Sequence, residues 1–251
     1  MGHEFEKVDS VEVGATPEEV WQAIATGPGI DSWFMGRNEV DAAGGVVRQS
    51  FGGYQPEHRV TAWEPMHRFA YRSDDAPDGR FIAYEFLVEG REKSSTVLRM
   101  ATSGFLPGDD WAAEYDAMTK GGALFFATLA TYLGHFAGRT ARPVTVFGPV
   151  VTDWPHARAT LLHALGLSDS PAPGDAVHVV ADGLGRIDGE VFFANEHTLG
   201  VRTPDALYRF MKGFGGPIVA GHHLFGETDP GAAERAWQAW LDTTFNGRER
   251  S

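Results

Sequence analysis

The sequence predicts an α+β protein with antiparallel sheets, and three features of the chain carry this prediction. Short runs with period-two alternation and hairpin-length connections fill residues 37–102. Apolar residues at helical spacing follow within 109–138. After residue 142 the order of strand, helix, strands and helix begins again, more loosely. Together these features predict a long helix lying across a curved sheet, followed by a second, similar arrangement.

The first elements are a strand and a capped helix. Residues 5–13 mix charged and β-branched residues and predict a strand. Thr16 and Glu19 have the spacing of a capping box, with proline at the first helical position. We expect this helix to stop at 27–29 and a second short helix at 30–34 to present Trp33 and Phe34.

The sheet that follows is expected to be antiparallel, with one apolar face. Its strands are predicted at 39–41, 46–51, 58–63, 69–72, 81–88 and 95–102. Period-two alternation places one set of side chains on a common face, namely Phe69, Tyr71, Ile82, Tyr84, Phe86, Val88, Leu98 and Met100.

The long helix at 109–138 carries an aromatic stripe. The stripe consists of Tyr115, Met118, Gly122, Phe125, Leu129, Tyr132 and Phe136. Asp110 is the predicted N-cap and Gly138 the predicted stop. Gly121 and Gly122 interrupt the helix, and each should cost about 1 kcal/mol relative to alanine. The stripe is either ordinary core or the wall of a ligand site, and the glycines are where we expect room for a ligand.

The second half predicts a smaller copy of the same plan. Strands are expected at 144–151, 176–181, 187–194, 198–203, 206–211 and 218–226, with helices at 153–165 and 230–245 and Gly247 beyond the last helix. Residues 67–73 resemble 197–203, and 84–86 resemble 208–210, in the same order. We therefore predict domains at 1–140 and 143–247. One large domain with a C-terminal elaboration is the alternative, and 206–211 could instead be helical because a helix-start signal precedes it.

Composition excludes several classes of protein. The chain has 251 residues, 43% of them hydrophobic, and a formal net charge of −13. Without clustered Lys and Arg, nucleic acid is not expected as a partner. No run of eighteen apolar residues and no signal-peptide core occur, so membrane insertion is not expected and a cytoplasmic location is. The absence of cysteine excludes disulfides, thiolate nucleophiles and thiolate metal sites.

No complete catalytic motif is present, and we expect neither a metal nor another cofactor. Phosphate-binding loops, nucleophile elbows and zinc-binding helices are missing from the sequence. His222 and His223 are adjacent on a predicted strand, so they point to opposite faces and should not share a metal. His58 is a weak candidate for a general acid or base, because it should lie on the inner face, whereas Glu85 and Arg99 should point outward.

The first 140 residues resemble a known superfamily. The matching pieces lie at 15–21, 30–34, 44–45, 60–71, 84–86, 98–105 and 121–133. They are similar to the START/polyketide-cyclase/pollen-allergen-like (SRPBCC) superfamily, and within it to homologues of the activator of heat shock protein 90 ATPase. The second half resembles the family only weakly. Family members usually carry Gly-Trp where this chain has Gly122 and Ala123, a departure expected to enlarge the space beneath the helix.

The resemblance implies a helix-grip fold, in which a curved sheet wraps around the long helix and leaves a cavity. Relatives bind lipids, sterols or polyketides, cyclise polyketides, or act as chaperone partners, and fold alone does not choose among these. Our leading hypothesis is non-catalytic binding of a small hydrophobic ligand, in a regulatory or stress-related role. The expected cavity residues are Trp33, Phe34, Phe51, Tyr71, Tyr84, Phe86, Met100, Phe105, Met118, Gly122, Phe125 and Leu129.

Two other functions remain open. One is a cyclase/aromatase-like or hydrolase-like enzyme that uses His58 together with a tyrosine of the cavity. The other is a co-chaperone-like interaction module with a protein partner, which would require an exposed apolar patch. The ligand, the pathway and the oligomeric state do not follow from the sequence.

Overall fold

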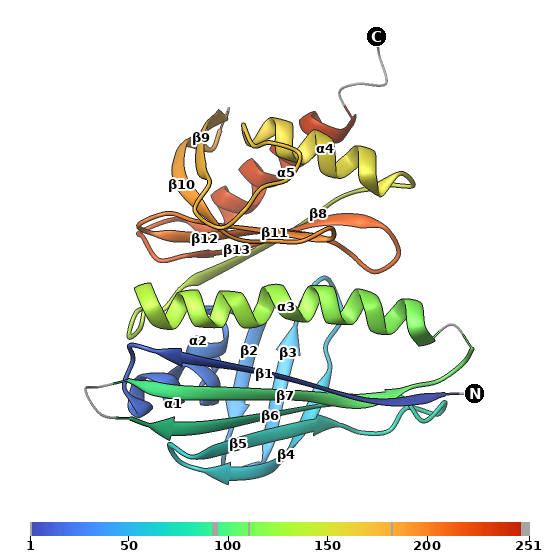
Figure 1. The fold of residues 1–251 in the computed structure, drawn as a ribbon, viewed down its shortest axis with the longest axis vertical. Helices are drawn as coiled ribbons and strands as arrows, with labels where there is room; N and C mark the ends of the chain where they lie inside the picture. Colours follow the sequence, from blue (N-terminus) through green and yellow to red (C-terminus); the bar gives the residue numbers. More distant parts are fainter. Residues whose placement is uncertain (1, 92–94, 110, 182, 247–251) are drawn as a thin grey trace. The chain divides into compact units, whose positions relative to one another are not determined.

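The computed structural model describes residues 2–91, 95–109, 111–181 and 183–246 (Figure 1). The chain divides into two compact units, Met1–Thr140 and Ala141–Ser251. Each has one antiparallel sheet and its own helices, which confirms the predicted α+β class. Among the described helices, none combines the length and the apolar character needed to span a membrane.

The first unit is built on a seven-stranded antiparallel sheet with the order β1-β7-β6-β5-β4-β3-β2. Its strands are β1 (His3–Val13), β2 (Arg37–Asp41), β3 (Val46–Ser50), β4 (Glu57–Glu64), β5 (Arg68–Ser73), β6 (Phe81–Gly90) and β7 (Thr96–Leu106). The first and last strands pair along their length, so that Val11 lies opposite Leu98. All other pairs are between strands that follow one another in the chain, as hairpin-length connections predict.

Two short helices connect β1 to β2. In α1 (Pro17–Ala25) the capping box is complete, because the Glu19 N–H donates to Thr16 Oγ1 (3.2 Å) and the Thr16 N–H donates to Glu19 Oε2 (2.8 Å). The first helix ends at the expected place, just before 27–29. The second helix, α2 (Gly27–Ile30), begins three residues before the predicted one. Thr26 caps it by accepting a hydrogen bond from the Gly29 N–H (3.0 Å), so the turn-forming residues enter the helix.

The long helix α3 (Trp111–His135) packs against β1, β7 and α1 and runs along the sheet (Figure 1). The sheet wraps around it, which confirms the helix-grip arrangement. The C-terminal half of the predicted stripe is core, since Leu129 and Tyr132 are buried, together with Phe136 just after the helix. Its N-terminal half, including Met118 and Gly122, is only half-buried. Asp110, the predicted N-cap, lies outside the described residues.

The glycines of α3 are not required by close packing. A Cβ atom placed on Gly121 or Gly122 would meet nothing within 4 Å outside the helix backbone. We therefore expect Gly122→Ala to stabilise the first unit by about 1 kcal/mol, because alanine restricts the unfolded chain and favours the helix. Urea denaturation would measure this, and destabilisation by Gly122→Ala would show that the position is sterically constrained.

The second unit repeats the plan with one strand fewer. It consists of β8 (Arg142–Val150), α4 (Trp154–Ala164), β9 (Ala176–Ala181), β10 (Gly185–Ala194), β11 (Thr198–Arg202), β12 (Ala206–Lys212), β13 (Pro217–Leu224) and α5 (Pro230–Asn246). The sheet order β8-β13-β12-β11-β10-β9 again places the first strand beside the last. This confirms the tandem architecture with a smaller second copy. Gly247, predicted to follow the last helix, lies outside the described residues.

The two sequence echoes fall on equivalent strands. Residues 84–86 lie on β6 and 208–210 on β12, and each of these strands pairs with the last strand of its own sheet. Residues 68–73 form β5 and 198–202 form β11, the next strand in each sheet. Segment 206–211 is therefore a strand and not a helix. Its pairing on both sides, with β11 and β13, overrides the local helix-start signal.

Candidate functional site

Four polar side chains lie next to one another on the inner face of the first sheet. Gln49, His58, Tyr71 and Tyr84 come from β3, β4, β5 and β6, one from each of four neighbouring strands. Tyr71 lies directly opposite Tyr84, and the His58 ring lies 5.6 Å from the Tyr71 ring and 6.4 Å from the Tyr84 ring, measured between centroids. We call these four residues the polar patch. It faces the interior of the first unit, which is otherwise mainly apolar.

His58 is a buried titratable group of the patch. Its side chain is 3% exposed, and its Nδ1 atom has no hydrogen-bond partner among the described residues. Burial lowers the pKa of His58 below its ordinary value, and the nearby Val47 backbone offsets this only in part. The imidazole is therefore neutral at pH 7, with a ring nitrogen that is free to form a hydrogen bond.

Gln49 is a second buried group with an unused hydrogen-bonding atom. It is 5% exposed, and its Nε2 has no partner among the described residues. Val47 lies opposite His58, and Gln49 is two residues further along the same strand, so the two polar side chains are diagonal neighbours on one face. Gln49 was not predicted from the sequence, because the inner face of the sheet was expected to be apolar. Its shared parity with Val47 on one strand was the signal that could have placed it on that face.

The two tyrosines extend the patch towards the aromatic core. Burial raises the pKa of Tyr71, and Tyr84 beside it contributes to the rise. Burial also raises the pKa of Tyr84, with a smaller contribution from Tyr54. Both hydroxyls are therefore protonated at neutral pH and are available as hydrogen-bond donors. Tyr71 is buried, whereas Tyr84 is half-buried, although it lies on the inner face of the sheet.

Aromatic side chains form the wall beside Tyr84. The Phe34 ring lies 6.1 Å from that of Tyr84 and 4.9 Å from that of Phe125 on α3. The Trp33 ring packs against those of Phe34 (5.2 Å) and Phe86 (6.1 Å), and its Nε1–H donates to the Ala23 carbonyl oxygen (3.0 Å). The structure thus brings the turn after α2, strand β6 and helix α3 together around one end of the patch.

The remaining predicted cavity residues lie in different environments. Met100 and Leu129 are buried in the core, whereas Met118 and Gly122 are half-buried on α3. Phe51 follows β3 and packs against Tyr54, with 5.4 Å between the ring centroids. Phe105 was predicted wrongly, because it lies on the opposite face of β7. Its neighbour Gly104 lies opposite Phe5, whose ring contacts Tyr115 of α3 (5.4 Å), so alternation directs Phe105 away from the helix.

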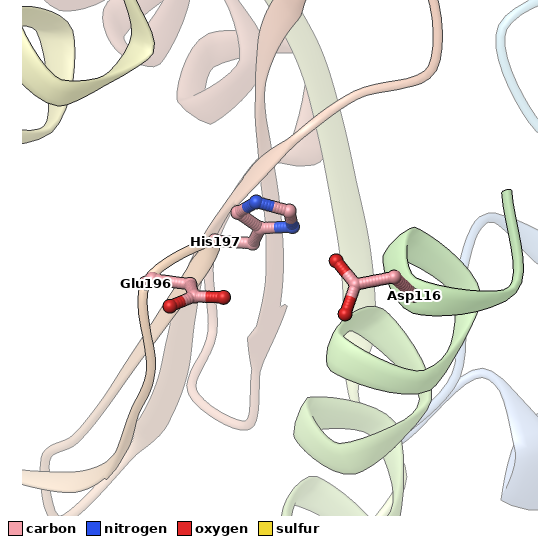
Figure 2. Close-up of side chains that lie close together, drawn as sticks. All are labelled: Asp116, Glu196 and His197. Carbon is pink, nitrogen blue, oxygen red and sulfur yellow. The ribbon is translucent and has the colours of Figure 1, made fainter. Parts of the chain in front are cut away.

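Among the described residues, acidic and imidazole side chains elsewhere do not define a metal site within either unit. Figure 2 shows Asp116, Glu196 and His197. Asp116 belongs to α3 of the first unit, where its Oδ2 lies 2.6 Å from the Lys120 Nζ, whereas Glu196 and His197 belong to the β10–β11 turn of the second. The positions of the two units relative to one another are not determined, so the three residues are assigned no common function. Within the second unit alone, two ligands are fewer than protein metal sites normally use.

Comparison with known proteins identifies the fold of the first unit. Residues 14–134 match the family described as Activator of Hsp90 ATPase homolog 1-like protein. Together with the sheet order and the long helix, this match decides the fold of residues 1–140. The first unit has an SRPBCC/Aha1-like fold. In this Aha1-like unit, the polar patch and its aromatic wall all lie within the matched residues. No curated protein matches the chain.

Solved structures resemble either the Aha1-like unit or the whole chain. Protein MLL2253 from Mesorhizobium loti is 25% identical over 51% of this chain and 96% of its own, with a TM-score of 0.44. The di-domain ARO/CYC BexL from the BE-7585A biosynthetic pathway is 13% identical over 98% of this chain and 95% of its own (TM-score 0.46). DynU16, from the dynemicin biosynthetic locus, is 20% identical over 97% and 98% (TM-score 0.42).

Proposed function

We propose that the Aha1-like unit binds a small hydrophobic molecule that carries a hydroxyl or carbonyl group. The apolar body of the ligand would lie against the aromatic wall formed by Phe34 and Phe125, and its polar group would reach the polar patch. Binding sites for small molecules usually combine a mainly apolar lining with a few polar groups that fix orientation. The proposal keeps the ligand class predicted from the sequence and adds the polar end.

The observation that carries the proposal is the pair of unused buried nitrogens, His58 Nδ1 and Gln49 Nε2. A buried polar atom without a partner costs about 1–3 kcal/mol, and most such atoms in native proteins are hydrogen-bonded. Two of them on the same face of neighbouring strands are best explained if a bound molecule supplies the missing partners. A hydroxyl group suits both atoms, because it can donate one hydrogen bond and accept another.

A pair of aromatic probes tests the polar end of this site. We expect 2-naphthol to bind the purified protein more tightly than naphthalene, because only 2-naphthol can form hydrogen bonds with the patch. His58→Phe and Gln49→Leu should each weaken 2-naphthol binding by about three- to tenfold, the value of one or two ordinary hydrogen bonds, and leave naphthalene binding nearly unchanged. Fluorescence titration would measure both affinities.

The matched control is His67→Phe, which removes an exposed imidazole from the β4–β5 turn of the same unit. It should not change the affinity for either probe. Equal binding of both probes, or equal loss in the His58, Gln49 and His67 variants, would contradict a ligand site at the polar patch.

A second candidate function is acid–base catalysis on the bound molecule. The single observation that favours it is the neutral, buried imidazole of His58. A neutral, buried imidazole with a free ring nitrogen can accept a proton from a ligand, and the Tyr71 ring lies 5.6 Å from the imidazole, measured between centroids. Binding and catalysis would use the same site, and only catalysis would produce turnover of a substrate. If the unit turns over a substrate with His58 as the general base, His58→Ala should lower kcat by at least about a hundredfold. An unchanged kcat in this variant would exclude His58 as the general base.

The interaction-module alternative receives less support from the first unit. It requires a contiguous apolar patch on the surface. The large apolar side chains exposed in the described part of this unit are Val8 on β1, Tyr54 after β3 and Met66 in the β4–β5 turn. They come from three separate elements, so we do not propose a protein-binding face here.

A further inference from the structure

The second unit contains a pocket of its own, separate from the polar patch. It has a volume of about 280 Å³ and lies where the β9–β10 turn, the start of β12, the end of β13 and the first turns of α5 meet. Small side chains leave the space open, notably Ala233 and Ala236 on α5 and Gly183 in the β9–β10 turn. The volume is close to the lower end of the range of about 300–1,000 Å³ found for ligand sites, so the pocket suits a small molecule.

Two aromatic rings form part of the pocket wall. Tyr208 on β12 and Trp237 on α5 both line it, with ring centroids 5.4 Å apart. Trp237 is fixed from behind by His222, whose ring centroid lies 4.1 Å away, and by Phe210 at 5.7 Å. The faces of electron-rich rings attract cations as well as apolar groups.

A carboxylate completes the pocket. Asp205, in the β11–β12 turn, accepts a hydrogen bond from Thr203 Oγ1 on its Oδ1 atom (2.9 Å), while its Oδ2 lies 3.8 Å from the position of a Cβ on Gly226, another lining residue. Among the described residues, no Lys or Arg lines the pocket and none forms an ion pair with Asp205, whose side chain is exposed to solvent. Burial, and to a smaller extent the charge of Asp205, raises the pKa of Tyr208 to about 12.

We propose that this pocket binds a small organic cation, namely an ammonium group on a compact apolar body. The ammonium would pair with the free Asp205 oxygen, and the apolar body would lie against Tyr208, Trp237 and the alanines of α5. Asp205 is exposed to solvent, and an ammonium group in the pocket would give it a charge-assisted hydrogen bond that no described residue supplies. The net charge of −13 would also attract cations over a long range. The site is independent of the polar patch in the first unit.

Three probes of similar shape test the charge of the ligand. Against the full-length protein, we expect 2-phenylethylammonium to bind at least about tenfold more tightly than neutral 2-phenylethanol, and 3-phenylpropionate not to bind measurably. Isothermal titration calorimetry at low salt would measure the three affinities. Equal affinities for the ammonium and the alcohol, or no binding of the ammonium up to its solubility limit, would overturn the proposal.

Three variants locate the binding. Asp205→Asn keeps the shape of the side chain and should abolish the preference for the ammonium probe, and Ala236→Leu should fill the pocket and block all binding. Glu234→Gln, which removes an exposed carboxylate of α5 that does not line the pocket, should change nothing. Circular dichroism and the melting temperature verify that each variant is folded. Ammonium binding that survives both Asp205→Asn and Ala236→Leu in folded protein would show that this pocket is not the site.

Discussion

Replacing Trp33 with alanine should destabilise the first unit by about 3–5 kcal/mol, the loss expected for a fully buried tryptophan. Trp33 is 1% exposed and packs between Phe34 and Phe86, where it joins the turn after α2 to the sheet. The substitution also removes the donor to the Ala23 carbonyl of α1. Because the aromatic wall depends on this residue, binding of 2-naphthol should be lost as well.

Hydrogen exchange followed by mass spectrometry can assign this effect to one unit. In Trp33→Ala, the free energy of opening should fall in peptides from α1, β6 and α3, and remain unchanged in peptides from β12 and α5. The control is Trp33→Phe, which keeps most of the packing and should cost about 1–3 kcal/mol, partly through the lost hydrogen bond. A cost below about 1 kcal/mol for Trp33→Ala would contradict the central position of this side chain.

Lowering the pH from 7 to 5 should destabilise the second unit, chiefly because of His222. This residue is 1% exposed and lies between the rings of Trp237, Tyr208 and Phe210. Its Nδ1 accepts a hydrogen bond from the Arg209 N–H (3.1 Å), whereas its Nε2 has no partner among the described residues. Burial, and to a smaller extent the charge of Arg209, lowers the pKa of His222 well below its usual value.

The sign of the effect follows from proton binding in the two states. In the unfolded chain a histidine has a pKa of about 6.5, so below that pH the unfolded state binds a proton that folded His222 does not. The contribution of neutral His222 to the free energy of unfolding is therefore fully present above about pH 6.5. Below that pH it falls by up to about 1.4 kcal/mol per pH unit, until the pH reaches the lowered pKa of the folded state. His58 should produce the same trend in the first unit.

Urea denaturation at several pH values, with hydrogen exchange to separate the units, would measure this loss. The variant His222→Asn keeps an acceptor for the Arg209 N–H and cannot be protonated. It should therefore be less stable at pH 7 and lose less stability towards pH 5. The control His163→Asn changes an exposed histidine of α4 and should leave the slope of the second unit unaltered. An equal slope in the wild type and in His222→Asn would contradict a neutral, buried His222.

Most helices and strands were predicted correctly from the sequence, because alternation and helix caps depend on residues close together in the chain. Period-two alternation located the inner face of β6, and the capping box at Thr16 located the start of α1 to the residue. Strand β12 was left open between helix and strand, and its pairing with two neighbours decided the outcome. The short helix α2 was misplaced, because glycine and proline at 27–29 signal a turn unless the preceding Thr26 caps them into a helix.

The candidate sites were harder to predict, since they depend on which strands become neighbours. His58 was found from its parity on one strand, but its relation to Gln49 and Tyr71 exists only in the assembled sheet. Phe105 was misassigned because the parity of Leu98 and Met100 was not carried on to the end of β7, where alternation turns Phe105 to the outer face. The pocket of the second unit is made by small residues from four separate segments, which no sequence pattern marks.

The central claim is that His58 and Gln49 receive a ligand on the inner face of the first unit. Nitrogen NMR of protein with 15N-labelled histidine tests it most directly. We predict that 2-naphthol shifts the His58 Nδ1 resonance as the free nitrogen becomes hydrogen-bonded, that naphthalene shifts it much less, and that the exposed His67 is unaffected by either. An unchanged His58 Nδ1 resonance at a 2-naphthol concentration that saturates binding would contradict the claim.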